Sequence, residues 1–261
     1  MLKLKKFKIS IIIFAILIIF TGCNSSFKTI KSVEDLANSN VGIYSSSEYD
    51  RILSQYVTTA KCKYYSSYAD QISSLKSGKI DGFLTDEPLA KEILKGTKGL
   101  TVIDKKLTED SYAFAISPKL TKLQENINKV LKDMKETGKL KEFEDKWMGD
   151  DENLKKLENY KYKASNGTLS FGTVSTIAPF SYIKNNEVVG YDIDVIKYIC
   201  KELKYNLNIV EMSFDGIIPS LISNKIDLAG ASIIVTEERK KSVLFSDADY
   251  TGGIVIVVRE K

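Results

Sequence analysis

Two stretches of the chain alternate between strand-like and helix-like apolar patterns, and this alternation most constrains the fold. Across residues 40–148, short apolar runs are followed by segments whose apolar residues recur every three or four positions. The same alternation returns across residues 168–259. Strands that alternate with helices are typical of parallel sheets covered by helices. The sequence therefore predicts an α/β protein.

The first 22 residues have the pattern of a bacterial export signal. Four lysines precede an almost wholly apolar run from Ile9 to Phe20, which is too short to cross a membrane, since a span needs roughly 20 residues. Gly22 and Cys23 then match the lipobox, in which the cysteine receives acyl chains after cleavage. We expect residues 1–22 to be removed and Cys23 to anchor the protein on the extracytoplasmic face of the cell membrane. An uncleaved anchor and a chance cysteine after the signal core remain the alternatives.

Removal of this leader changes the charge balance. The whole chain has 38 lysines and arginines against 34 acidic residues. Four of the lysines lie in the leader, so the rest of the chain has 34 charges of each sign. This balance does not favour binding to nucleic acid. The chain also has no histidine, which removes the commonest general base and transition-metal ligand. We therefore expect neither a metal nor another cofactor.

Motifs in both halves of the chain resemble one family of binding proteins. The longest is SFDGIIPSLISNKIDLAGASIIVTEERKKSVLFSD at residues 213–247. The shorter ones are APFSY (178–182), VGYDID (189–194), LKSGKID (75–81), DEP (86–88) and WMG (147–149). These segments resemble the family 3 bacterial solute-binding proteins, the amino-acid receptors of ABC importers. The resemblance implies the type 2 periplasmic binding protein fold, in which two α/β lobes close over the ligand.

The order of these segments departs from that of the family. Residues 213–247 resemble part of the family's first lobe, yet they lie near the end of this chain. Residues 31–149 resemble what normally follows. This order suggests a circular permutant, and two fragments of a tandem pair are the alternative. A permutant would have one of its two covalent lobe connections cut, with residues 252–259 as the severed strand in a loosened hinge.

The resemblance implies a division of the chain into parts. Residues 23–30 form a tether, residues 31–110 form lobe 2, and residues 111–149 return to lobe 1 as a hinge strand and its C-terminal helices. A polar linker at residues 150–167 leads to residues 168–261, which form the N-terminal part of lobe 1 and a hinge strand. Both pairing of the two parts within one chain and their exchange in a domain-swapped dimer remain open.

A free amino acid has a carboxylate and an ammonium group, so its site needs one fixed cation and one fixed anion. The resemblance assigns Arg239 of lobe 1 to the carboxylate, since the planar guanidinium can donate two parallel hydrogen bonds. It assigns Asp86 of lobe 2 to the ammonium group. A ligand held by both would join the lobes. The residues alone leave two alternatives open, a solvated charge for Arg239 and a helix cap for Asp86.

Four further residues are implied contacts of the ligand. Ser46 and Ser47 lie in a serine run before a helix, where N–H and hydroxyl groups can bind the ligand carboxylate. Ser232 matches a backbone or hydroxyl contact. Phe214 matches an aromatic residue that covers the ligand, with a place in the ordinary core as its alternative.

Three residues bear on specificity. Val174 and Ile177 replace residues that are often acidic and aromatic, respectively, in relatives, and Ile234 replaces a common hydroxyl contact. An unpaired cationic side chain against such a wall would be costly to desolvate. The sequence therefore predicts a neutral, fairly apolar amino acid in preference to a basic one.

The leading hypothesis is a lipid-anchored receptor, not an enzyme, that delivers an amino acid to an ABC transporter permease. Two other classes of function remain. A few relatives are cyclohexadienyl dehydratases, although this chain has no histidine to act as general acid. A non-binding remnant of a tandem protein, or a surface interaction module, would explain the replaced contacts at Val174 and Ile234.

Overall fold

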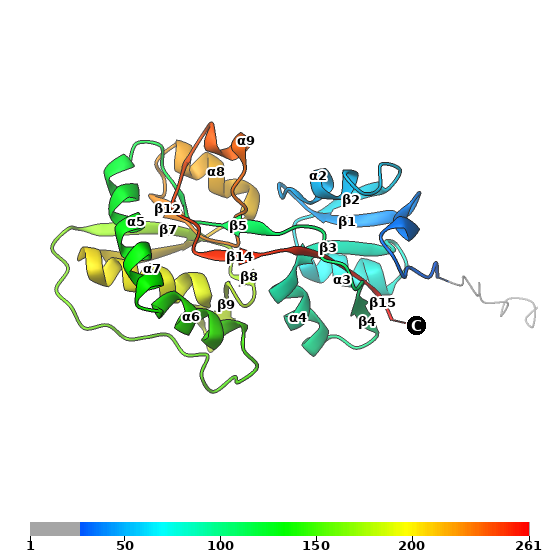
Figure 1. Ribbon diagram of the computed structural model, residues 1–261, viewed down its shortest axis with the longest axis horizontal. Coiled ribbons are helices and arrows are strands. Elements are labelled where there is room, and N and C mark those ends of the chain that lie inside the picture. Colours follow the sequence, from blue (N-terminus) through cyan, green and yellow to red (C-terminus); the bar gives the residue numbers. More distant parts are fainter. Residues whose placement is uncertain (1–26, 261) are drawn as a thin grey trace, which may run out of the picture.

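The computed structural model describes residues 27–260, which form two α/β lobes that lie end to end (Figure 1). Lobe 2 is built around a five-stranded sheet with the order β2-β1-β3-β15-β4. Lobe 1 is built around a second five-stranded sheet with the order β11-β7-β12-β6-β13. The predicted fold class, two lobes with helix-flanked sheets, is confirmed. The signal peptide and Cys23 lie outside the described residues.

Lobe 2 forms from the N-terminal part of the chain and one C-terminal strand. Its strands are β1 (Asn40–Tyr44), β2 (Lys61–Tyr65), β3 (Gly82–Asp86), β4 (Leu100–Val102) and β15 (Ile254–Arg259). Its helices are η2 (Glu34–Leu36), α2 (Tyr49–Ser54), α3 (Tyr68–Lys76) and α4 (Glu87–Gly96). Ser67 caps α3, because its hydroxyl accepts the N–H of Asp70. Pro88 fits the first turn of α4, where no backbone donor is needed.

Lobe 1 forms from the middle of the chain. Its main sheet contains β6 (Ala115–Ile116), β7 (Thr168–Thr173), β11 (Asn206–Glu211), β12 (Leu228–Ala229) and β13 (Leu244–Phe245). A small sheet contains β8 (Thr176–Ile177), β9 (Ser181–Lys184) and β10 (Glu187–Val189). The helices are α5 (Thr121–Glu136), α6 (Lys139–Met148), α7 (Tyr191–Leu203), α8 (Phe214–Ile222) and α9 (Glu237–Lys240).

The two main sheets have the same construction. In each, three parallel strands are neighbours, and the first of these three in chain order lies in the middle, β1 in lobe 2 and β7 in lobe 1. In each, an antiparallel strand from the other lobe then enters beside the third strand, β15 in lobe 2 and β6 in lobe 1. These entering strands follow β14 (Tyr250–Gly252) and β5 (Asp110–Tyr112), which pair with each other between the lobes. We call β5 and β14 the hinge strands.

The expected cut connection between the lobes is wrong. The chain crosses once through β5 from lobe 2 to lobe 1, and crosses back through β14 to end in β15 (Figure 1). Five of the six residues of β15 are buried, because the strand lies between β3 and β4 with both faces covered. The apolar run at residues 254–258 is therefore a central strand of lobe 2, and both connections are covalent.

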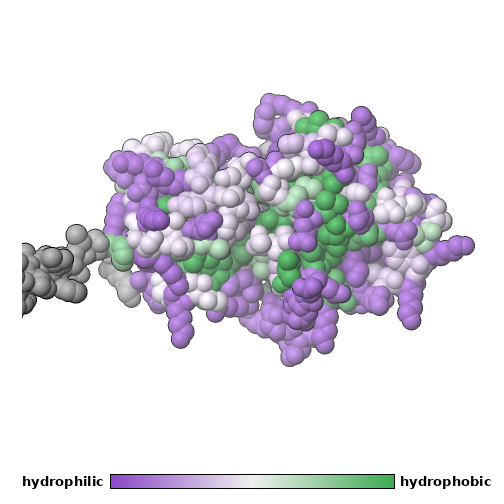
Figure 2. All heavy atoms as spheres, turned by 180° about the vertical axis from the view of Figure 1, so that it is seen from behind, coloured by the Kyte–Doolittle hydropathy of each residue, from purple (hydrophilic) through white to green (hydrophobic). Residues whose placement is uncertain are grey.

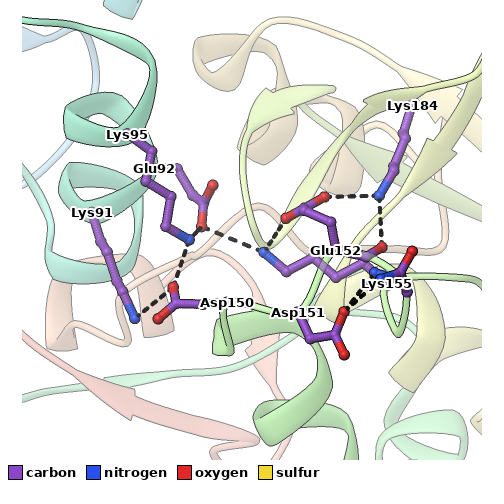
Figure 3. A network of polar contacts seen from close by, with 9 residues as sticks. Lys91, Glu92, Lys95, Asp150, Asp151, Glu152, Lys155 and Lys184 are labelled. Carbon is purple, nitrogen blue, oxygen red and sulfur yellow. Dashed lines mark hydrogen bonds and ion pairs between the residues drawn. The ribbon is translucent and has the colours of Figure 1, made fainter.

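The polar linker is fixed to both lobes. Glu152 pairs with Lys184 of β9 in lobe 1 at 2.9 Å, and Asp150 pairs with Lys95 of α4 in lobe 2 at 2.8 Å (Figure 3). The backbone N–H of Glu158 donates to the buried carboxylate of Asp194. The segment predicted as a spacer therefore also bridges the lobes.

Lys155 is the buried centre of this bridge. Its side chain is 1% exposed, and its Nζ lies 2.8 Å from Glu152 and 3.5 Å from Glu92 of α4. Figure 3 shows the ammonium group between these two carboxylates, one from the linker and one from lobe 2. The pKa of Glu152 is lowered to about 2 by hydrogen bonds from Lys155 and Lys184. A buried ammonium needs such partners, since desolvation alone would disfavour its charge.

Seen from behind, hydrophilic side chains project from both lobes, and apolar side chains gather on lobe 1 and along the boundary between the lobes (Figure 2). Within residues 27–260, no helix has the length and apolar character that a membrane crossing requires.

Replacement of Lys155 by methionine should lower the free energy of unfolding by about 1–2 kcal/mol, because charge-assisted hydrogen bonds to both carboxylates are lost. The control is Lys91→Met, since Lys91 pairs with Asp150 at the surface and such pairs contribute little. Urea denaturation measures both variants. Equal stability of the Lys155 variant and the wild type would contradict a bridging role for the linker.

Candidate functional site

Asp86 joins both lobes and a hinge strand. It ends β3, is 1% exposed, and its carboxylate accepts three hydroxyl hydrogen bonds. The donors are Tyr49 of lobe 2 at 3.1 Å, Ser232 of lobe 1 at 3.0 Å and Tyr112 of β5 at 2.7 Å. These three donors meet most of the hydrogen-bonding capacity of the carboxylate, but as neutral groups they do not balance its charge.

Arg239 reaches from lobe 1 to lobe 2. Its Nη1 donates to the carbonyl of Ile234 at 2.9 Å, and its Nη2 donates to the carbonyl of Ser46 in lobe 2 at 3.0 Å. Its Nε lies 3.8 Å from the carboxylate of Glu48, and its guanidinium lies over the ring of Phe214. The side chain is 10% exposed. Arg239 is therefore an interlobe contact, which rules out the solvated helix-end charge that the sequence left open.

One cavity lies where these groups meet. Its lining comes from both lobes and consists of Tyr44, Ser47, Glu48, Tyr49, Tyr68, Ile177, Phe214, Ser232, Ile234 and Arg239. The cavity measures about 10 Å³, which is about the room that one water molecule needs. An amino acid can enter only if the lobes separate.

The structure brings most of the predicted contact residues to this cavity. Five of them line it: Arg239, Phe214, Ser232, Ser47 and Ile177. Asp86 lies just behind the lining, since it accepts hydrogen bonds from Tyr49 and Ser232. Ser46 lines an adjoining cavity of about 210 Å³ that shares Phe214 and Arg239 with the first.

Two expected details differ from the structure. Val174 lies outside the lining of both cavities, and it is buried with its carbonyl bonded to the hydroxyl of Ser181. The N–H of Ser47 is not turned toward a ligand but donates to the carbonyl of Tyr44, because residues 44–47 form a tight turn. In this turn Ser46 presents its carbonyl to Arg239 rather than an N–H group to a carboxylate.

Ser46 and Ser232 both adopt left-handed backbone conformations. Their φ angles are 63° and 47°, which non-glycine residues adopt at a cost in strain. The Ser46 conformation turns its carbonyl toward Arg239, and that of Ser232 allows its N–H to face Asp192 while its hydroxyl faces Asp86. These two left-handed serines therefore both take part in interlobe contacts.

The sequence reasoning missed the tyrosines and the acid of the lobe 2 wall. Tyr44 stacks on Tyr68 with ring centroids 4.7 Å apart, and it meets Phe214 of lobe 1 edge to face at 5.9 Å. Glu48 and Tyr49 begin α2 directly after the serine run. Their position after a strand end was a usable signal, because such residues lie at one edge of a parallel sheet.

Burial perturbs the titration of the site. The pKa of Asp86 is raised to about 6 by burial, although its three hydroxyl donors act in the opposite direction. The pKa of Asp192 is raised to about 7, also by burial. Burial and the nearby Asp86 charge raise the pKa of the Tyr49 hydroxyl well above its usual value. Burial lowers the pKa of Arg239, and Glu48 acts against this shift.

Residues 27–260 contain no cluster of three or more acidic or cysteine side chains arranged to bind a metal ion. The polar groups of the candidate site are instead one guanidinium, two carboxylates and several hydroxyls. This set can bind an anionic group and a cationic group at the same time.

Comparison with known proteins gives a family for part of the chain. Residues 169–261 match the family of bacterial extracellular solute-binding proteins, family 3. The resemblance read from the sequence is confirmed for this part of the chain.

Two curated relatives cover the same part. Over 93 residues the chain is 36% identical to ABC transporter arginine-binding protein 1 of Escherichia coli (strain K12), covering 35% of this chain and 38% of that protein. Over 91 residues it is 38% identical to the histidine-binding periplasmic protein of the same organism, covering 34% and 35%. The chain thus spans little more than a third of the length of these relatives.

Among solved structures, the arginine-bound form of domain 1 from TmArgBP is 40% identical, with a TM-score of 0.31. The match covers 36% of this chain and 80% of that chain.

Replacement of Asp86 by asparagine should change how stability depends on pH. The pKa of Asp86 is raised from 3.8 to about 6 by burial, so the folded protein binds more protons than the unfolded chain between about pH 4 and 6. Stability from this group is therefore present below about pH 4 and is lost as pH rises through about 6. Over this range the wild type should lose about 2–3 kcal/mol that the variant does not lose.

The measurement is urea denaturation of both proteins from pH 4 to 7.5. Buried acids that do not interact with Asp86 titrate in both proteins and cancel in the difference. Asp192 contributes to the difference, because the Asp86 charge helps to raise its pKa. If the free energies of unfolding of the wild type and the variant change equally with pH, Asp86 is hydrated in solution.

Proposed function

We propose that the protein is an extracytoplasmic receptor that binds one amino acid between its lobes and delivers it to an ABC transporter permease. The observation that carries this proposal is that Arg239 of lobe 1 lines one interlobe cavity and Asp86 of lobe 2 lies just behind its lining. The amino-acid-binding relatives of residues 169–261 support it.

In this proposal the ligand carboxylate binds the guanidinium of Arg239, and the ligand ammonium group binds near Asp86. The ligand carboxylate would replace the backbone carbonyls that now accept hydrogen bonds from Arg239. Arg239 would then donate to a charged acceptor instead of neutral ones. The ammonium group would supply the positive charge that the buried Asp86 lacks, and this favours ionised Asp86. Phe214 and the tyrosines of lobe 2 would cover the apolar part of the ligand.

The ligand would favour the closed arrangement of the lobes. It can touch Arg239 and Asp86 together only when the lobes are close, and a ligand shifts an equilibrium only through such differential contact. The hinge strands β5 and β14 provide a two-strand connection about which the lobes can open.

We propose a neutral, fairly apolar amino acid as the ligand. Ile177, Ile234 and Phe214 give the lobe 1 wall its apolar character. A basic amino acid is the second candidate, because Glu48 adds a carboxylate to the wall and the relatives include proteins named for binding arginine and histidine.

We further propose that the chain is a circular permutant of the family fold. Residues 31–149 would supply the part that normally follows the segment matched at residues 169–261. The equal construction of the two sheets supports this, since the chain contains two lobes with a five-stranded sheet in each. The permutation would leave both hinge strands intact and place the new ends in lobe 2.

Binding should depend on both charged groups. Arg239→Lys and Asp86→Asn should each weaken binding of the preferred amino acid at least tenfold, because one charge-assisted interaction at each end of the ligand is lost. Lys240→Gln is the matched control, since Lys240 adjoins Arg239 but pairs with Glu237 at the surface. Calorimetric titration of the purified proteins measures the effect, after a thermal-shift screen of the standard amino acids and cystine.

The same screen tests the other functions. A bound ligand at a hundredfold excess over its dissociation constant should stabilise the protein by about 2.7 kcal/mol. If arginine binds tightly and no neutral amino acid binds, the proposed preference for an apolar amino acid is wrong. No stabilisation by any amino acid would favour a non-binding remnant, and turnover of prephenate would favour a dehydratase.

Membrane attachment should depend on Cys23, which we propose as the site of lipidation. In a bacterial host the wild type should incorporate labelled palmitate and sediment with membranes, since two or three acyl chains hold a protein firmly. Cys23→Ala should do neither. A variant that remains at the membrane would indicate an uncleaved N-terminal anchor instead.

A further inference from the structure

Glu48 lies between two arginines at the edge of the candidate site. One of its carboxylate oxygens lies 3.8 Å from Nε of Arg239, and the other accepts from Nε of Arg51 at 2.8 Å. The Glu48 side chain is 17% exposed, whereas that of Arg51 is 56% exposed. Glu48 therefore connects a buried cation of lobe 1 with a surface cation of its own helix.

Arg239 needs a negative partner when the lobes are closed. Its side chain is 10% exposed and makes hydrogen bonds to two neutral carbonyls, which do not balance its charge. Among the acidic residues described, only Glu48 forms an ion pair with it within 4.0 Å. The closed protein thus compensates Arg239 with a carboxylate of its own chain.

A ligand carboxylate would compete for the same guanidinium. The cavity that Glu48 and Arg239 both line measures about 10 Å³, so an incoming carboxylate would lie close to that of Glu48. Two carboxylates at one cation repel each other, and burial strengthens the repulsion.

We propose that Glu48 is an internal competitor that occupies Arg239 in the ligand-free protein, lowers its affinity for amino acids and holds the empty lobes together. This inference rests on the proposed function and deepens it. Ligand binding then requires Glu48 to leave Arg239. Arg51 makes this exchange possible, because Glu48 keeps a charged partner when it turns outward.

The test is Glu48→Gln, which removes the charge and preserves the size of the side chain. We expect at least tenfold tighter binding of a neutral amino acid, measured by calorimetry on the full chain with the standard L-amino acids and L-cystine as probes. We also expect the lobes of the ligand-free variant to lie farther apart than those of the wild type. Fluorescence energy transfer between a label on each lobe measures this distance.

Two further variants separate competition from a structural role. Glu238→Gln removes an exposed charge one residue from Arg239 and should leave affinity unchanged. Arg51→Gln removes the partner that Glu48 would keep after it leaves Arg239. It should therefore weaken binding in the wild type and have no effect in the Glu48→Gln background. A merely structural residue would not show this dependence.

The outcomes are distinguishable. Binding by the Glu48→Gln variant that is equal to or weaker than that of the wild type overturns the inference and leaves the proposed function intact. Loss of arginine binding in the variant also overturns it, because Glu48 would then contact the ligand side chain. If neither protein binds any amino acid, the proposed function fails, and unchanged lobe separation in the ligand-free variant then overturns the inference as well.

Discussion

The buried carboxylate of Asp86 is the contact on which the arrangement of the lobes depends. It accepts hydroxyls from Tyr49, Ser232 and Tyr112, which belong to lobe 2, lobe 1 and a hinge strand. Burial raises its pKa to about 6, so its charge is held at a cost that these donors only partly offset. Burial makes the ionised form of this carboxylate unfavourable, and a bound cation would stabilise it. Because Asp86 contacts three parts of the molecule, such a cation would act on all of them.

Around this contact the protein satisfies its own charges. Arg239 is bound by carbonyls of both lobes and faces Glu48, and Asp86 is bound by hydroxyls. The linker adds a second interlobe connection through the buried Lys155. The closed form is therefore stabilised without any ligand. In the proposed function, an amino acid would have to offer better partners than the chain itself supplies.

The sequence predicted the elements of the fold better than their connections. The α/β alternation and the family resemblance of residues 169–261 were readable because they rest on local periodicity and local motifs. The cut hinge was a wrong prediction. Residues 254–259 have the apolar pattern of any buried strand, and only their pairing with β3 and β4 shows that they belong to lobe 2. Strand pairing across such distances has no local signal.

The candidate site divides in the same way. The sequence by itself pointed to Arg239 and Asp86 as the charged groups of the site, because both residues lie in recognisable motifs. Only the tertiary structure decided what those groups contact: Glu48 opposite Arg239, tyrosines around Asp86 and Val174 outside the cavity. The physical reason is that the residue type alone sets the functional group of a side chain. Its partners and its desolvation depend on segments brought together from far along the chain.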